Sequence, residues 1–132
     1  MDEKPLTVLV VDDDESVRRA MRRLLMSNGY RVRTFESAED LLLSSLVCDK
    51  ACLLLDIRLP GISGLELYTK IAASGVKCPV IFMTAHDDSQ WPDKTKEAGA
   101  VAFLRKPFGE QSLLRAIALA CSEPQGTDAT AA

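Results

Sequence analysis

Short runs of apolar residues recur along the chain, and a polar residue follows each run. Runs this short and this uniformly apolar are typical of strands buried on both faces of a parallel sheet. Residues 30–35 instead alternate polar and apolar side chains, as a strand at the edge of a sheet does. The runs that we expect to be buried strands are residues 7–11, 51–55, 80–83 and 101–105.

Segments with helical periodicity separate these strands. Residues 15–27 carry apolar side chains three and four positions apart, and Gly29 is typical of the residue just beyond a helix. Ser37 resembles a helix N-cap, because acidic residues follow it in what would be the first turn. We expect the second, third and last helices at about residues 37–45, 65–74 and 110–121.

The alternation of strands and helices predicts a doubly wound, flavodoxin-like α/β fold. Its sheet would have five parallel strands in the order 2-1-3-4-5, with about five flanking helices. Pro92 disfavours a helical residue before it, so the fourth helix, within residues 86–97, must be short or begin late. Residues 1–121 would form this single domain, and residues 122–132 a flexible tail or the start of a linker.

Composition narrows the class of protein. A chain of 132 residues suits one domain, and its net charge of −3 argues against a nucleic-acid-binding surface in this segment. No apolar stretch reaches the roughly 18 residues of a membrane span, so we expect no membrane contact and a cytoplasmic location. The cysteines contain no CxxC pair and are interpreted as isolated thiols, not as a disulfide frame or a zinc site. They are Cys48, Cys52, Cys78 and Cys121.

Polar side chains stand where four of the predicted strands end. Asp12 and Asp13 follow the first strand and Asp56 the third, while Thr84 and Lys106 follow the fourth and fifth. Open parallel sheets bind ligands at the carboxyl ends of their strands, where the strand order reverses. That switch point lies between the first and third strands. We therefore expect three carboxylates, a hydroxyl and an ammonium group in one crevice.

Clustered carboxylates repel one another unless protons or a hard cation neutralise them. Magnesium binds oxygen ligands, often one or two carboxylates together with phosphate oxygens. Asp13 and Asp56 would supply the carboxylates, and the backbone carbonyl of Arg58 a further oxygen. Asp56 would then be free to attack phosphorus and hold an acyl phosphate. Lys106 and Thr84 are suited to bind the phosphoryl oxygens.

Four motifs resemble those of the response-regulator receiver domain, a family of the CheY-like superfamily. The motifs are VVDDDESVR (10–18), LLLDIRLPGISG (53–64), MTAH (83–86) and FLRKPF (103–108). The resemblance covers residues 6–121, and it extends in particular to the receivers of FixJ-like and NtrC-like transcription regulators. It implies a two-component signalling module that switches an output, such as transcription, and is not itself an enzyme.

The resemblance also implies a role for each site residue. Asp56 would accept a phosphoryl group from a histidine kinase or a phosphotransferase. Asp12 and Asp13 would hold Mg²⁺, Asp13 directly and Asp12 largely through water. Thr84 and Lys106 would bind the phosphoryl group.

Phe103 matches the aromatic switch position of the family, whose ring turns inward as the threonine moves toward the phosphate. The strand that carries Phe103 and its neighbouring helices would be the output face, and a homodimer through the fourth helix and fifth strand is possible. By analogy with the family, docking of a kinase or phosphotransferase near the first helix is an alternative that stays open. That helix also has a basic face, which is more typical of a solvated surface than of a docking site; it comprises Arg18, Arg19, Arg22 and Arg23.

Two other functions remain open from the residues. A phosphatase of the haloacid-dehalogenase type also uses an aspartate nucleophile and magnesium, but it requires a second acid where this chain has Arg58. A domain that kept the fold and binds partners without phosphorylation is the other alternative. His86, the single histidine, is expected to line the mouth of the site without a catalytic role.

Overall fold

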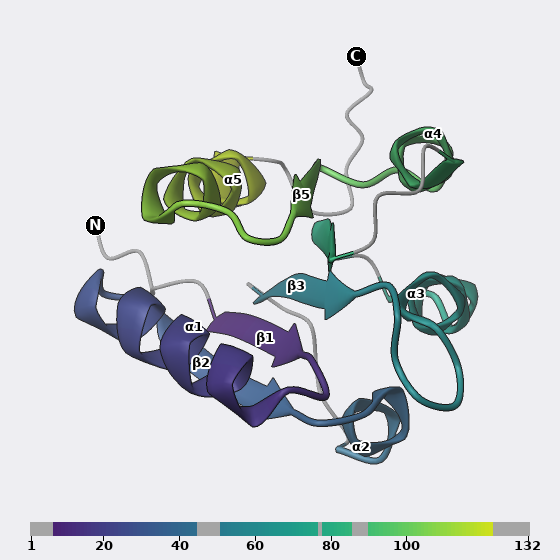
Figure 1. Ribbon diagram of the computed structural model, residues 1–132. Helices are drawn as coiled ribbons and strands as arrows, with labels where there is room; N and C mark the ends of the chain where they lie inside the picture. The colour runs from purple at the N-terminus through teal and green to yellow at the C-terminus, as the bar shows by residue number, and fades with distance from the viewer. Residues whose placement is uncertain (1–6, 45–50, 77, 86–89, 123–132) are drawn as a thin grey trace.

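The computed structural model describes residues 7–44, 51–76, 78–85 and 90–122. It contains one parallel sheet with the strand order β2-β1-β3-β4-β5, which confirms the predicted topology (Figure 1). The strands are β1 (Thr7–Val11), β2 (Arg31–Phe35), β3 (Ala51–Asp56), β4 (Val80–Thr84) and β5 (Ala102–Arg105). The helices are α1 (Glu15–Ser27), α2 (Ala38–Leu42), α3 (Gly64–Ala73), α4 (Gln90–Glu97) and α5 (Glu110–Ser122).

Helices cover both faces of the sheet, and each face has its own apolar core. Leu25 of α1 and Leu113 of α5 pack against one face, together with alternate residues of the strands. Leu67 of α3 and Trp91 of α4 belong to the cluster on the opposite face, as does Ala38 of α2. Successive side chains of a strand point to opposite faces, so every residue of the central strands can be apolar.

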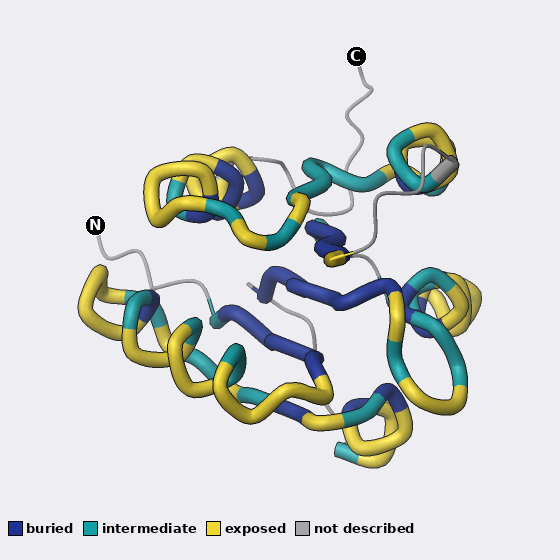
Figure 2. The backbone as a smooth tube through the Cα atoms, in the orientation of Figure 1, coloured by how far each residue is buried: buried dark blue, intermediate teal, exposed yellow. Residues whose placement is uncertain are grey.

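The two border strands differ from the central three (Figure 2). In β2, Arg31 and Arg33 are exposed, which agrees with the predicted edge strand. In β5 every residue is at least partly accessible, and Arg105 is exposed. The prediction that residues 101–105 form a strand buried on both faces was therefore wrong. An edge strand has a neighbour on one side only, and β5 is the last strand of this sheet.

Helix ends are where prediction and structure differ most. The helix α2 has only five residues and ends at Leu42, short of the expected residue 45. The helix α3 begins at Gly64, because Ser63 and Glu66 form a capping box there. Pro92 falls in the first turn of the eight-residue α4, which confirms the prediction of a short helix.

Several other expectations concern cysteines and chain ends. Cys52, Cys78 and Cys121 form no disulfide among the described residues, and burial raises the pKa of the Cys52 thiol to about 12. Cys48, His86 and residues 123–132 of the predicted tail lie outside the described residues. Among the helices that are described, none combines the length and apolarity that crossing a membrane requires.

Candidate functional site

Strand register brings the acidic side chains together at the carboxyl edge of the sheet. Val11 of β1 lies beside Leu55 of β3, so the residues that follow them, Asp12 and Asp56, are neighbours. The amide of Asp12 donates to Phe35 O of β2 at 3.1 Å, and the amide of Ile57 donates to Met83 O of β4 at 2.9 Å. These bonds fix both strand ends to their outer neighbours, and the carboxylates project from a rigid edge.

Three carboxylates form a cluster at this edge. Asp12, Asp13 and Asp56 each offer an oxygen, and these atoms all lie within 4.8 Å of one another. Asp12 is 0% exposed and Asp56 5% exposed, whereas Asp13 is exposed. The carboxylate of Asp12 accepts from the Asp14 amide at 2.9 Å and from Lys106 Nζ at 2.6 Å. Asp13 is therefore the carboxylate that is open to an ion arriving from solvent.

Lys106 is the cation of the cluster. Its ammonium lies 2.6 Å from Asp12 Oδ2 and 3.2 Å from Asp56 Oδ2, and its side chain is 18% exposed. Its amide donates to Thr84 O at 2.8 Å, which ties the segment after β5 to the end of β4. The peptide between Lys106 and Pro107 is cis. Burial alone would lower the pKa of Lys106, but the hydrogen bond to Asp12 and the charges of both carboxylates raise it overall.

Asp56 lies in an environment that disfavours its negative charge. Burial is the main cause that raises its pKa to about 6, and the nearby charge of Asp12 adds to the effect. Lys106 opposes the shift, and so does the amide of Arg58, which donates to Asp56 Oδ1 at 3.1 Å. A carboxylate with this pKa is ionised at pH 7 but poorly solvated, which is the condition of an available nucleophile.

Thr84 and Phe103 lie next to the cluster on β4 and β5. Thr84 is fully buried at the end of β4. Register pairs Phe82 with Phe103 and Thr84 with Arg105, so these four side chains share one face of the sheet. The Phe103 ring packs against the core, and the Arg105 guanidinium lies 6.0 Å from its centroid. Phe103 is thus placed beside the site, not within it.

Two contributors were not anticipated from the sequence. Arg18 was assigned to a solvated face, but its side chain is only 17% exposed and donates to the backbone carbonyl of Asp12 at 2.8 Å. Gly64 was expected to lie just before the third helix, at residues 65–74, yet a Cβ at this position would lie 2.2 Å from Asp56 O. The capping signal at Ser63 marks a helix start near Gly64 and could have placed it at the base of the site.

The close approach of Gly64 leads to a stability prediction. Gly64→Ala should lower the free energy of unfolding by about 1–3 kcal/mol, because the new methyl group forces the end of β3 and the start of α3 apart. Chemical denaturation followed by circular dichroism would measure this change. Gly109→Ala is the matched control, since a Cβ there meets nothing within 4 Å and it should change stability by less than about 0.5 kcal/mol. Equal effects of the two substitutions would contradict the contact.

The charges of the cluster determine which ligand it suits. Three carboxylates face one ammonium group, so the site carries an excess of negative charge. Oxygen ligands, with an exposed Asp13 beside a buried Asp56, fit a hard divalent cation. The described residues of the cluster offer no thiolate or imidazole, the ligands that softer metals favour.

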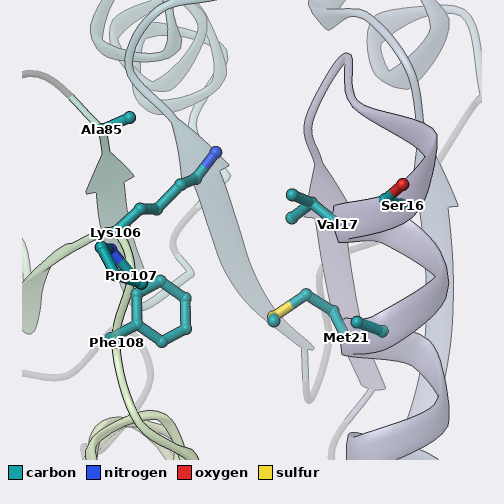
Figure 3. A pocket seen from close by; sticks show the side chains of 8 residues that line it. Ser16, Val17, Met21, Ala85, Lys106, Pro107 and Phe108 are labelled. Carbon is teal, nitrogen blue, oxygen red and sulfur yellow. The ribbon is translucent and has the colours of Figure 1, made fainter.

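A groove of about 600 Å³ opens beside the cluster, between α1 and the segment that follows β5. Val17 and Met21 of α1 face Pro107 and Phe108 across this groove, and Lys106 extends across its upper end (Figure 3). Its walls are mostly apolar, so a partner that reaches the acidic cluster from this side meets an apolar surface first.

The fold and the site together define a class of protein: a doubly wound α/β domain with clustered carboxylates and a lysine at the switch point of its sheet. The family described as the response regulator receiver domain matches residues 8–118. The chain belongs to this family.

Individual relatives agree with that membership. The transcriptional regulatory protein TdiR of Thauera aromatica is 43% identical over 111 residues, which cover 84% of this chain and 49% of TdiR. The structure of the response regulator StyR has a TM-score of 0.83 at 45% identity and covers 90% of this chain and 60% of StyR. FixJ-N has a TM-score of 0.84 at 33% identity, with 94% of this chain and 98% of FixJ-N covered. The chain spans about half the length of the curated relatives it matches, such as 49% of TdiR.

Proposed function

We propose that this chain is a phosphorylation-dependent switch of a two-component system, with Asp56 as the phosphoacceptor. The observation that carries the proposal is the placement of one buried, high-pKa carboxylate between two further acids and a lysine. The phosphoryl donor would be a phosphohistidine of a kinase or phosphotransferase, as the family resemblance implies. We place the chain in the cytoplasm, which is consistent with relatives named as transcriptional regulatory proteins.

The chemical step needs one nucleophile and one means of charge neutralisation. A carboxylate oxygen of Asp56 forms the new bond to phosphorus, while the bond from phosphorus to the donor nitrogen breaks and its electron pair stays on that nitrogen. Lys106 already contacts Asp56 Oδ2 at 3.2 Å and is positioned to stabilise charge on the transferred oxygens. Thr84 stands at the neighbouring strand end and would supply a hydroxyl to the same group.

Asp13 and Asp56 would hold Mg²⁺, assisted by the Arg58 carbonyl, with Asp12 contributing largely through water. The bound cation would screen the negative field that an anionic phosphoryl group meets as it approaches Asp56. Asp12 Oδ2 already lies 2.6 Å from Lys106 Nζ, which supports a contact between Asp12 and the cation that runs through water.

The output follows from the neighbours of the site. Movement of Thr84 toward a phosphoryl group would vacate space on the face that it shares with Phe103, and the ring would turn into that space. This change would alter the face made by α4 and β5, where a homodimer could form. TdiR and FixJ are named as transcriptional regulatory proteins, which supports control of transcription as the output.

Intact-mass measurement after incubation with acetyl phosphate and Mg²⁺ tests the proposal. The natural chain should gain one phosphoryl group, and Asp56→Asn should gain none, because the amide is not a nucleophile. Asp40→Asn, which changes an exposed carboxylate of α2, should behave like the natural chain. Chelation of Mg²⁺ should suppress the adduct.

Three results would contradict this assignment. An adduct that persists in Asp56→Asn would place the acceptor elsewhere. A natural chain that forms no adduct at any Mg²⁺ concentration would favour the phosphorylation-independent interaction domain. Rapid release of inorganic phosphate from many phosphate esters would instead favour the phosphatase alternative, which the presence of Arg58 in place of a second acid argues against.

A further inference from the structure

We propose that Arg18 is a positioning residue that raises the affinity of the site for a divalent cation by holding the peptide between Asp12 and Asp13. The proposal rests on the cation site proposed above. Arg18 Nη1 donates to Asp12 O at 2.8 Å, from a side chain that is 17% exposed. Its Nη2 lies 3.9 Å from Glu36 Oε1, just beyond the end of β2. One guanidinium group thus links α1 to the ends of two strands.

Asp12 is held at each of its polar groups. Its amide donates to Phe35 O at 3.1 Å, and its carbonyl accepts from Arg18 at 2.8 Å. Its carboxylate accepts from the Asp14 amide and from Lys106. Asp12 is fully buried, so removal of Arg18 would leave the Asp12 carbonyl without this hydrogen-bond donor. A buried acceptor that has lost its donor is costly, so the peptide would shift toward another donor.

The peptide that Arg18 holds is the one that orients Asp13. A peptide group is planar, so fixing the oxygen of Asp12 also fixes the amide and the Cα of the next residue. Asp13 is exposed, and its carboxylate makes no hydrogen bond or ion pair among the residues that the structure describes. The bond from Arg18 restrains the peptide before Asp13, and the Asp14 amide, which donates to Asp12 Oδ1 at 2.9 Å, restrains the peptide after it. Loss of the Arg18 bond would therefore loosen one of the two sides from which the backbone of Asp13 is held.

A purely electrostatic role for Arg18 would have the opposite consequence. A positive guanidinium group near the cluster repels a cation, so its removal would tighten cation binding. A positioning role predicts weaker binding after its removal, because Asp13 then samples orientations that point away from the site. The sign of the change in affinity therefore separates the two roles.

Isothermal titration of the unphosphorylated chain with Mg²⁺ provides the test. Arg18→Met should weaken binding by about tenfold, the lower end of what outer partners of metal ligands contribute. Arg18→Lys keeps a hydrogen-bond donor and the positive charge, so it should lose less Mg²⁺ affinity than Arg18→Met. Arg19→Met is the matched control, because Arg19 is a neighbouring arginine of α1 with a side chain 69% exposed and paired with Glu15, and it should bind like the natural chain.

Thermal unfolding of each variant checks that it is folded, and the titrations are made well below the lowest midpoint. If Arg18→Met does not fold, the loss of Mg²⁺ affinity in Arg18→Lys relative to Arg19→Met decides between the two roles. Unchanged or tighter binding in the Arg18 variants, while the natural chain binds Mg²⁺ and is phosphorylated, would overturn the positioning role alone. A natural chain that does not bind Mg²⁺ would overturn the proposed cation site and this inference with it.

Discussion

At pH 8 and without divalent cations, Asp56→Asn should be more stable toward unfolding than the natural chain. Burial is the main cause that raises the pKa of Asp56 to about 6, from an ordinary value of 3.8, so folding at high pH forces a charge into an unfavourable place. One pKa unit corresponds to about 1.4 kcal/mol, and the gain should be on the order of 2–3 kcal/mol. The amide has a similar size and carries no charge.

The pH dependence of this gain follows from proton linkage. Between pH 3.8 and about 6 the folded chain holds the Asp56 proton more tightly than the unfolded chain does. The contribution of Asp56 to stability is therefore fully present below pH 3.8 and is lost as the pH rises through 6. The difference between variant and natural chain should grow over this interval and stay constant above it.

Urea denaturation at a series of pH values, followed by circular dichroism, measures this difference. Glu97→Gln, which neutralises an exposed carboxylate at the end of α4, should show no comparable gain. Added Mg²⁺ should stabilise the natural chain but not Asp56→Asn, because binding to the folded state alone raises stability. A gain that is the same at pH 4 and pH 8 would show that the charge of Asp56 is not its cause.

Lys106→Met should lower the free energy of unfolding by about 3 kcal/mol at pH 8, the loss expected when one member of a buried ion pair is removed. Lys106 is the ammonium that contacts both Asp12 and Asp56, and methionine has similar length but no charge. Asp12 would be left fully buried without its strongest hydrogen-bond donor. The same urea denaturation at pH 8 would measure the loss.

A double substitution shows where this loss originates. Adding Asp56→Asn to Lys106→Met removes one of the two uncompensated charges, so Asp56→Asn should raise stability by more in this background than the roughly 2–3 kcal/mol expected in the natural chain, and the two changes are not additive. Lys96→Met, an exposed lysine of α4, should leave stability within about 0.5 kcal/mol of the natural chain. Strict additivity of the Lys106 and Asp56 changes would contradict direct coupling between them.

The topology and the convergence of the acidic residues were predictable because both depend on local sequence patterns. Apolar runs mark the central strands, and parallel strands bring the residues after them to one edge. This reasoning placed Asp12, Asp13 and Asp56 together, and the structure has their oxygens within 4.8 Å. The roles assigned to these residues, to Thr84 and to Phe103 stay predictions until phosphorylation and cation binding are measured.

Contacts between distant segments were not predictable in the same way. Lys106 donates a hydrogen bond to Asp12, 94 positions away in the chain. No periodic pattern in the sequence predicts which carboxylate accepts the shorter bond. Arg18 shares a helix with exposed arginines, and only the packing of α1 on the sheet separates it from them. The burial of residues 101–105 was overestimated for a related reason. An apolar run predicts a strand but not whether that strand lies at the centre or at the border of the sheet.

The arginines at the borders of the sheet have a consequence for self-association. β2 presents Arg31 and Arg33 to solvent, and β5, the opposite border, ends in the exposed Arg105. Unpaired strand edges are templates for a strand from another molecule, and charged side chains on such edges oppose that addition. A second copy that brought its own border alongside would place guanidinium groups against guanidinium groups. We therefore expect these arginines to oppose the addition of a strand from a second copy at either border.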